Sequence, residues 1–212
     1  MSSESETKIG ARKCILQAAA KLFARLGLDK CSTREIAKES DSNISLISYY
    51  FGGKEGLYKE VMRDHANRIK ANAQLIFQKT DGRPKTKDVF IEQVGYMIES
   101  MIWFRVNYPE MAKIFAREKL TGMTHAKEVH EEIFYPMILK FIETFTEGQA
   151  KGYVKSDINP ALFFIAMSEG IWGFFEMMDC RMRLSQDCEE LAKDRNEVKN
   201  QMMKIYLTGV LT

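Results

Sequence analysis

The residues from Thr33 to Lys54 carry side chains whose chemistry and spacing suit contact with DNA. Their hydroxyls, amide and ammonium can bond base edges or phosphates, and an aliphatic group can contact the methyl of thymine. We expect these side chains to divide into three groups. The first would face a major groove or its walls, the second is a single residue that would touch thymine methyls, and the third would contact phosphates. The groove set is Asn43, Ser45, Leu46, Ser48 and Tyr49, the methyl contact is Ile44, and the phosphate set is Thr33, Arg34, Tyr50 and Lys54.

Two short helices joined by a polar turn must position these side chains, as in a helix-turn-helix. Ser32 and Glu35 have the spacing of a capping box, which predicts the start of the first helix. Ser40-Asp41-Ser42 predicts the turn, and Asn43 is expected to cap the second helix over residues 44–50. A small apolar core would hold this second helix in place: Ile36, Ala37, Ile47, Phe51 and Leu57.

Helical spacing of apolar residues continues on both sides of this motif, and strand-like alternation is absent. The sequence therefore predicts an all-α fold. A linker is expected at Asp81-Gly82-Arg83-Pro84. Helices are predicted at about residues 8–26, 54–79, 89–104, 109–121, 125–150 with a kink at Pro136, 159–179 with Asn159 as its cap, and 187–211.

Composition and charge narrow the class of protein. With 212 residues, 45% of them hydrophobic, the chain can bury a substantial core. Residues 1–83 contain 15 Lys and Arg against 10 Asp and Glu, which favours a polyanionic partner, although an ordinary solvated surface would explain the same excess. The polar N-terminus and the lack of an apolar run of about 20 residues predict a cytoplasmic protein outside the membrane.

Motifs for catalysis or metal binding are not evident. His125 and His130 lie five residues apart, whereas a metal pair on a helix prefers four, so neither a metal nor another cofactor is expected. The four cysteines lack zinc-site spacing and are expected to be reduced thiols, although Cys180 and Cys188 could form a redox switch. The sequence lacks a nucleophile motif and an acid–base pair, so we do not predict an enzyme.

The stretch from Thr33 to Leu57, and above all the run SYYFGGKEGLY, resembles the DNA-binding segment of TetR-type (tetracycline-repressor-like) transcriptional regulators. This stretch covers about a quarter of the chain, and the rest is similar only in length, helix order and a few local patterns. Two departures stand out: Ser40-Asp41-Ser42 replaces a small-Gly-aliphatic turn, and the second helix has no Arg or Lys to bond guanine. The matching residues are Thr33, Ile36, Ala37, Tyr49, Phe51, Lys54, Glu55 and Leu57.

The resemblance implies a helix-turn-helix domain at residues 1–53 and a helical domain at 54–212, connected by the helix at 54–79. The second domain would bind a ligand and dimerise through its last two helices. The resemblance thus implies a ligand-responsive repressor that, as a homodimer, releases a palindromic double-stranded DNA operator when a small molecule binds. A helical ligand-binding or scaffold protein that has lost DNA binding remains the alternative, because of Ser42 and the uncharged second helix.

Apolar residues of the second domain are candidates for the ligand pocket and for the dimer interface. Thirteen Met and thirteen Phe suggest an adaptable site for a small, mostly apolar effector, although such side chains more often form plain core. The helix at 159–179 is apolar on more than one face, so it needs partners on more than one side. The pocket candidates are Met97, Met101, Trp103, Phe104, Phe115, Phe134, Ile138, Phe141 and Met167. The candidates for the dimer interface are Phe163, Phe164, Trp172, Phe175, Val198, Met202 and Ile205.

Overall fold

The computed structural model of the chain describes residues 3–79 and 83–212, without the side chains of residues 3–9, 73 and 75–79. Within the described ranges the regular secondary structure is helical, with one isolated antiparallel bridge between Val154 and Leu211. The predicted all-α fold class is therefore confirmed. Of the predicted linker, Asp81 and Gly82 lie outside the described residues.

Internal contacts divide the chain into two units, which we describe separately. The first unit is Met1–Arg68 with Tyr108–Phe134, and the second unit is Ile69–Asn107 with Tyr135–Thr212. The sequence instead placed a division after residue 53. The difference arises because α6 (Pro109–Leu120) packs on α1 (Ser3–Lys30), a contact between distant segments that leaves no local signal.

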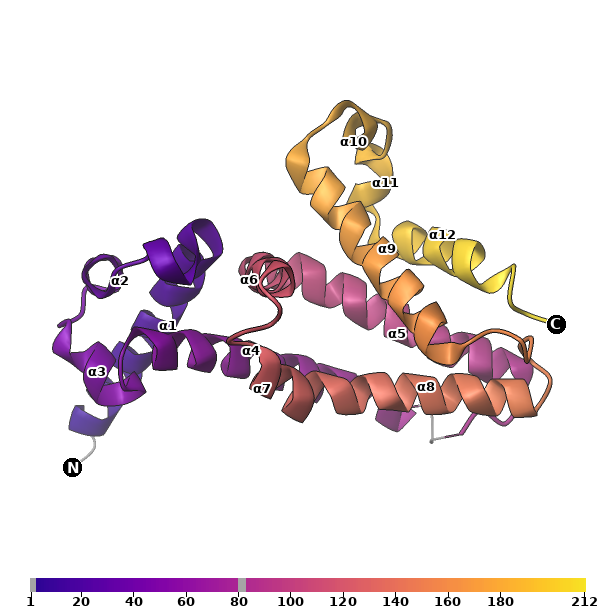
Figure 1. Cartoon of the computed structure of the whole chain (residues 1–212), viewed down its shortest axis with the longest axis horizontal. Helices are drawn as coiled ribbons and strands as arrows, with labels where there is room; N and C mark the ends of the chain where they lie inside the picture. Colours follow the sequence, from indigo (N-terminus) through magenta and orange to yellow (C-terminus); the bar gives the residue numbers. More distant parts are fainter. Residues whose placement is uncertain (1–2, 80–82) are drawn as a thin grey trace. The chain divides into compact units, whose positions relative to one another are not determined.

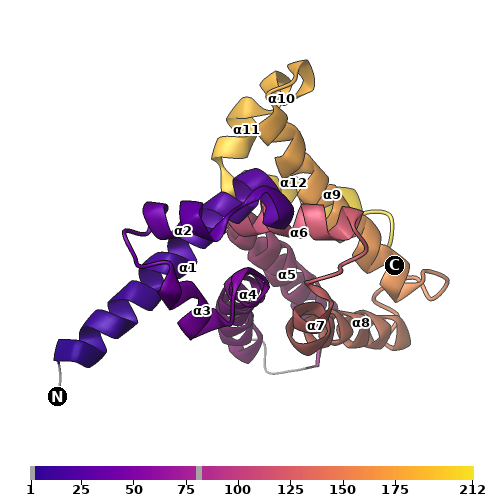
Figure 2. The same cartoon turned by 60° about the vertical axis from the view of Figure 1, so that its left-hand side comes forward.

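The first unit contains the predicted helix-turn-helix, with α2 and α3 packed against α1 (Figures 1 and 2). Buried side chains such as Phe23 of α1 and Met111 and Ile114 of α6 form its interior. Besides α1 and α6, its described helices are α2 (Thr33–Glu39), α3 (Ser45–Phe51), the first part of α4 (Lys54–Lys79), α7 (Lys127–Val129) and the π-helix η1 (His130–Phe134).

Several predicted helix ends are confirmed by the backbone. Gly27 interrupts α1 with φ 79° and ψ 170°, and only a short turn to Lys30 follows. Ser32 and Glu35 form the capping box at the start of α2, and Pro109 occupies the first turn of α6. The kink expected at Pro136 takes the form of η1, a wider turn that ends two residues before it. Proline has no N–H for an α-helical bond, so a change of helix type here has a local cause.

The second unit is a helical bundle around one apolar core. Phe90 and Ile98 of α5, Phe145 of α8 and Met167 and Ile171 of α9 are fully buried in it. Its described helices, besides the end of α4, are α5 (Lys87–Asn107), α8 (Tyr135–Ala150), α9 (Pro160–Cys180), α10 (Arg183–Asp187), α11 (Glu189–Lys193) and α12 (Arg195–Leu207).

The last predicted helix, residues 187–211, is wrong as a single element. The structure has two helices there, α11 and α12, with α10 ending at Asp187, and the Asp194 side chain caps α12 by accepting bonds from the N–H groups of Asn196 and Glu197. Asn159 caps α9 as predicted. Among the described helices, α9 is long and apolar enough to cross a membrane by length and composition alone, a test that a core helix of a globular protein also passes.

Candidate nucleic-acid interface

The two sides of α3 differ sharply in exposure. Ile47 is fully buried and Phe51 is nearly so, whereas Ile44, just before the helix, is 43% exposed and Tyr49 is 73% exposed. Ser45 and Ser48 are exposed on the same outward side. The small core predicted from the sequence is confirmed, since its members are all buried: Ile36, Ala37, Ile47, Phe51 and Leu57.

The turn between α2 and α3 is held by its own hydrogen bonds. Asp41 adopts a left-handed backbone with φ 49°, as expected for the position where a glycine is common. The Ser40 hydroxyl donates to the Ile36 carbonyl at 2.8 Å, and the Ser42 hydroxyl donates to the Ser40 carbonyl at 3.1 Å. Ser42 is half-buried, and its backbone N–H donates to the Ala37 carbonyl at 3.0 Å. The two serine hydroxyls of this unusual turn thus find acceptors in α2 and in the turn itself.

The start of α3 corrects one prediction. The helix begins at Ser45, one residue later than predicted, and Ile44 precedes it in a turn without a side-chain cap from that residue. The Asn43 carboxamide oxygen still serves the helix start, since it accepts the Ser45 backbone N–H at 2.9 Å and the Ser45 hydroxyl at 2.8 Å. Asn43 therefore supplies the capping bond predicted for it, from one residue before the assigned N-cap position.

The exit from α3 is a tight turn into α4. Gly52 ends the helix with φ 70°, and Gly53 follows with φ 116°, a conformation that L-residues with side chains rarely adopt. Close to this turn, the Arg12 guanidinium of α1 lies 5.4 Å from the centre of the Phe51 ring and pairs with Glu60 of α4. These contacts fix the end of α3 to α1 and α4.

Lys54 is placed differently from the phosphate contact predicted for it. Its ammonium donates to the carbonyl oxygens of Leu28 at 2.9 Å and Asp29 at 3.4 Å, at the end of α1. Lys54 thereby ties the start of α4 to the end of α1. Contact with a phosphate would have to compete with these two bonds.

The other phosphate candidates lie at the surface of the first unit. Arg34 is exposed and Thr33 is half-buried at the start of α2, and Tyr50 is half-buried beside Tyr49, with ring centres 5.0 Å apart. Next to them, the Ser32 backbone N–H and hydroxyl donate to the Glu35 carboxylate at 2.8 and 2.7 Å and lower its pKa. The contact of Thr33, Arg34 and Tyr50 with DNA phosphates stays a prediction.

A buried polar cluster in the first unit was missed by the sequence analysis. The Glu118 carboxylate of α6 accepts the Tyr58 hydroxyl of α4 at 3.0 Å and the backbone N–H groups of His125 and Ala126 at 2.9 and 3.1 Å. Burial, and then the nearby Glu118 carboxylate, raise the pKa of Tyr58. Glutamate in the last turn of a polar-faced helix gives no sequence signal for such burial.

The predicted pocket residues fall into both units. Phe115 and Phe134 belong to the first unit, where their ring centres are 5.0 Å apart. Met97, Phe104, Phe141 and Met167 are buried in the second unit, where Met101, Trp103 and Ile138 are half-buried. Met97, Phe141 and Met167 share one core with Met101 packed against it, and a ligand cavity among the set stays a prediction.

Four of the predicted dimer residues are corrected, because the chain buries them in its own second-unit core. Phe164 and Trp172 are half-buried, and Ile205 is 67% exposed. Apolar spacing alone cannot separate a helix face that meets its own core from one that meets a partner. The four core residues are Phe163, Phe175, Val198 and Met202.

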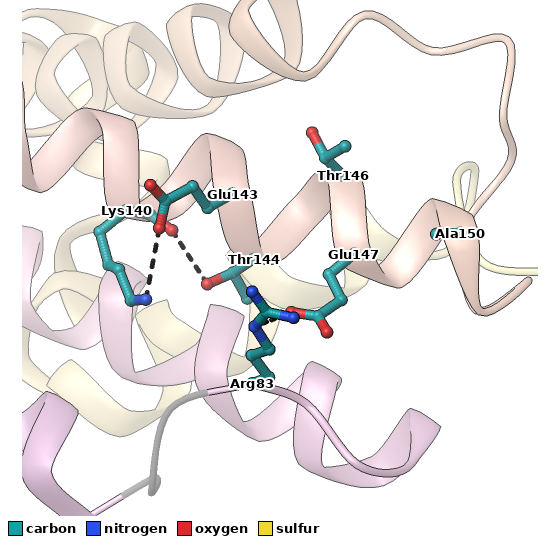
Figure 3. A pocket seen from close by; sticks show the side chains of 7 residues that line it. All are labelled: Arg83, Lys140, Glu143, Thr144, Thr146, Glu147 and Ala150. Carbon is teal, nitrogen blue, oxygen red and sulfur yellow. Dashed lines mark hydrogen bonds and ion pairs between the residues drawn. The ribbon is translucent and has the colours of Figure 1, made fainter.

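A hollow of about 470 Å³ lies on the second unit along α8 (Figure 3). Its charged side chains pair with one another, Arg83 with Glu147 at 3.7 Å and Lys140 with Glu143 at 3.4 Å. The lining contains none of the predicted pocket residues. The lining residues are Arg83, Lys140, Glu143, Thr144, Thr146, Glu147 and Ala150.

The similarity to known proteins includes the helix-turn-helix segment. Residues 15–61 match the family model for bacterial regulatory proteins of the tetR family. The chain is 30% identical over 151 residues to the HTH-type transcriptional repressor NicS of Pseudomonas putida, covering 69% of this chain and 67% of that protein. It is 28% identical over 138 residues to the HTH-type transcriptional dual regulator CecR of Shigella flexneri, covering 60% of this chain and 59% of that relative, less than two thirds of its length.

Solved structures share the fold over nearly the whole chain. The ketosteroid transcriptional regulator KstR2 of Mycobacterium tuberculosis has a TM-score of 0.71 at 17% identity, covering 95% of each chain. The fatty acid degradation regulator FadR of Bacillus halodurans has a TM-score of 0.67 at 16% identity, covering 92% of this chain and 94% of that one. With the match at residues 15–61 and the similarity to NicS, the chain belongs to the TetR family of bacterial regulatory proteins.

Proposed function

We propose that this chain is a DNA-binding transcriptional repressor of the cytoplasm. The observation that carries the proposal is α3, whose outward side is exposed while its inward side is buried in a small core. This arrangement lies within the segment that matches the family. A short helix held in this way can enter a major groove without unfolding its support.

A selection from random DNA duplexes with the full-length chain tests the proposal. The selected duplex should bind with an affinity that falls as salt rises, because phosphate contacts release counterions. Tyr49→Ala removes the most exposed ring of α3 and should weaken binding about tenfold. The matched control is Tyr135→Ala in α8, whose ring is 49% exposed and should leave affinity unchanged. Failure to select any duplex, or equal affinity of the two variants, would refute the proposal.

The repressor is proposed to act as a homodimer on a palindromic operator. Leu162 and Ile165 of α9 and Ile205 of α12 are apolar and exposed. Tyr206 donates to the Ala166 carbonyl at 3.3 Å, so each exposed isoleucine directly precedes a residue that joins the two helices. A two-fold dimer would cover this surface and place two copies of α3 on successive half-sites.

Mass measurement by light scattering checks the dimer. The wild type should elute at twice the chain mass of 24.5 kDa. Ile165→Glu combined with Ile205→Glu should give monomers, whereas Leu139→Glu, at an exposed site of α8, should not. A monomeric wild type would refute the dimer, and a dimeric double variant would refute this interface.

The effector is proposed to be a small, mostly apolar molecule that releases the operator. The support is the Met- and Phe-rich core of the second unit, with flexible side chains such as Met97, Met101 and Met167. Apolar compounds should raise the melting temperature and weaken operator binding, because a ligand stabilises the state that binds it. Stabilisation by hydrophilic compounds alone would refute this class.

The alternative is a helical ligand-binding or scaffold protein without DNA binding. It is favoured by one observation, the absence of Lys and Arg between Asn43 and Gly53. Such a protein would show stabilisation by ligands but no selected duplex, which separates it from the repressor in the same experiments.

A further inference from the structure

We propose that Ile44 determines sequence specificity by contacting a thymine methyl group in each half-site. This inference rests on the proposed DNA-binding function and adds the class of base pair that α3 reads. The segment that would enter the groove presents few side chains to base edges.

The polar groups of the outward side leave little means to recognise guanine or cytosine. Residues 43–53 contain no Arg, Lys, Gln, Asp or Glu, so the paired contacts that those side chains make with guanine, adenine and cytosine are unavailable from α3. Asn43 supplies the one amide, and Ser45, Ser48 and Tyr49 supply hydroxyls. A hydroxyl can donate or accept, so by itself it selects weakly among bases.

The structure also removes the usual adenine contact from Asn43. A paired contact needs the carboxamide oxygen to accept from adenine N6 while the nitrogen donates to N7. The Asn43 oxygen already accepts two bonds from Ser45, one from the backbone N–H at 2.9 Å and one from the hydroxyl at 2.8 Å. With both lone pairs of that oxygen used, only donation to N7 remains, and adenine and guanine both offer N7.

Ile44 offers a contact that only thymine can complete. Its side chain is 43% exposed, whereas Ile47 and Phe51 are the residues of α3 buried in the core beneath it. Nearly half of Ile44 therefore remains accessible to a partner. In the major groove only thymine carries a methyl group, so burial of Ile44 against that methyl distinguishes an A·T pair from a G·C pair. Ser48 lies one helical turn away on the same side and is compatible with either base of that pair.

Replacing thymine by uracil in the selected duplex tests the contact, since uracil lacks the methyl but keeps its base-pairing groups. Substitution at one position in each half-site should weaken binding by the full-length chain about fourfold per half-site, the value of one buried methyl group. Ile44→Ala should bind thymine and uracil duplexes equally, and Ile44→Val should keep part of the discrimination. The matched control is Leu139→Ala, at an aliphatic side chain of α8 that is 39% exposed and should leave discrimination intact.

The outcomes separate this inference from the proposed function. Discrimination that disappears with Ile44→Ala and persists with Leu139→Ala supports it. A selected duplex that binds tightly but ignores uracil at every thymine, or discrimination that Ile44→Ala retains, overturns the inference and leaves the repressor standing. If no duplex is selected, both the proposed function and this inference are overturned.

Discussion

Replacing Tyr58 by phenylalanine removes one hydroxyl from the interior of the first unit while keeping the ring. Tyr58 is 2% exposed and Glu118 is 3% exposed, and the bond between them is 3.0 Å long. A hydrogen bond to a charged group contributes about 1.5–3 kcal/mol to stability, so Tyr58→Phe should lower the free energy of unfolding by about 2 kcal/mol.

Glu118→Ala should cost more, because it leaves three donors without their acceptor. These are the Tyr58 hydroxyl and the backbone N–H groups of His125 and Ala126. At about 1–3 kcal/mol for each unsatisfied buried group, the loss should reach about 4 kcal/mol. In the Glu118→Ala background, Tyr58→Phe should cost almost nothing, which gives a coupling energy of about 2 kcal/mol.

Urea unfolding followed by circular dichroism measures these changes as shifts of the midpoint at constant slope. Tyr135→Phe is the control, since Tyr135 lies in α8 and is half exposed, and its change should stay within about 0.5 kcal/mol. A Tyr58→Phe variant that behaves like this control, or that costs as much without Glu118 as with it, would show that the bond between Tyr58 and Glu118 does not stabilise the fold.

Three further predictions follow from single contacts. Burial raises the pKa of Tyr58 in the folded state, so its contribution to stability is present below about pH 10 and is lost above it, by up to about 1.4 kcal/mol per pH unit. In urea unfolding, the free energy of unfolding should therefore fall less at alkaline pH in Tyr58→Phe than in the wild type. Gly56→Ala would place a methyl 1.8 Å from the Phe51 carbonyl oxygen, so its melting temperature should fall and operator binding should weaken. Gly170→Ala would place a methyl 1.8 Å from the Tyr206 hydroxyl, so it should cost less free energy of unfolding in a Tyr206→Phe background than in the wild type.

The controls for these three use positions without such contacts. An alanine at Gly10 of α1 meets nothing within 4 Å and should stabilise slightly, as glycine-to-alanine changes in open helices do. Burial also raises the pKa of Cys31. The wild type and Tyr58→Phe both contain this thiol, so its effect on the pH dependence of stability cancels when the two are compared. The first prediction is contradicted if Tyr58→Phe loses as much stability at alkaline pH as the wild type. The second is contradicted if Gly56→Ala raises the melting temperature, and the third if Gly170→Ala lowers the free energy of unfolding equally in both backgrounds.

Features with a local cause could be predicted from the sequence. The capping box at Ser32 and Glu35, the proline at the start of α6 and the Asn159 cap depend on residues within one turn of each other, and each is found where expected. The buried side of α3 followed from spacing in the same way. Asp41 took the left-handed backbone because its turn required it.

Features that depend on distant contacts could not be predicted. The Lys54 ammonium reaches carbonyls at the end of α1, and Glu118 is buried only because Tyr58 and the turn after α6 enclose it. Phe163 and Phe175 of α9 pack in the chain's own core, whereas Ile165 is exposed on the same helix. A helix that is apolar around most of its surface does not reveal which side meets its own core and which side remains for a partner.

The two backbone amides held by Glu118 also report on how the first unit opens. His125 and Ala126 lie in the turn between α6 and α7, where amide hydrogens usually exchange readily with solvent. Here both donate to the buried Glu118 carboxylate, so exchange with deuterium requires this turn to open away from Glu118. These two positions are therefore natural probes of that opening, readable by hydrogen exchange without any label on α3.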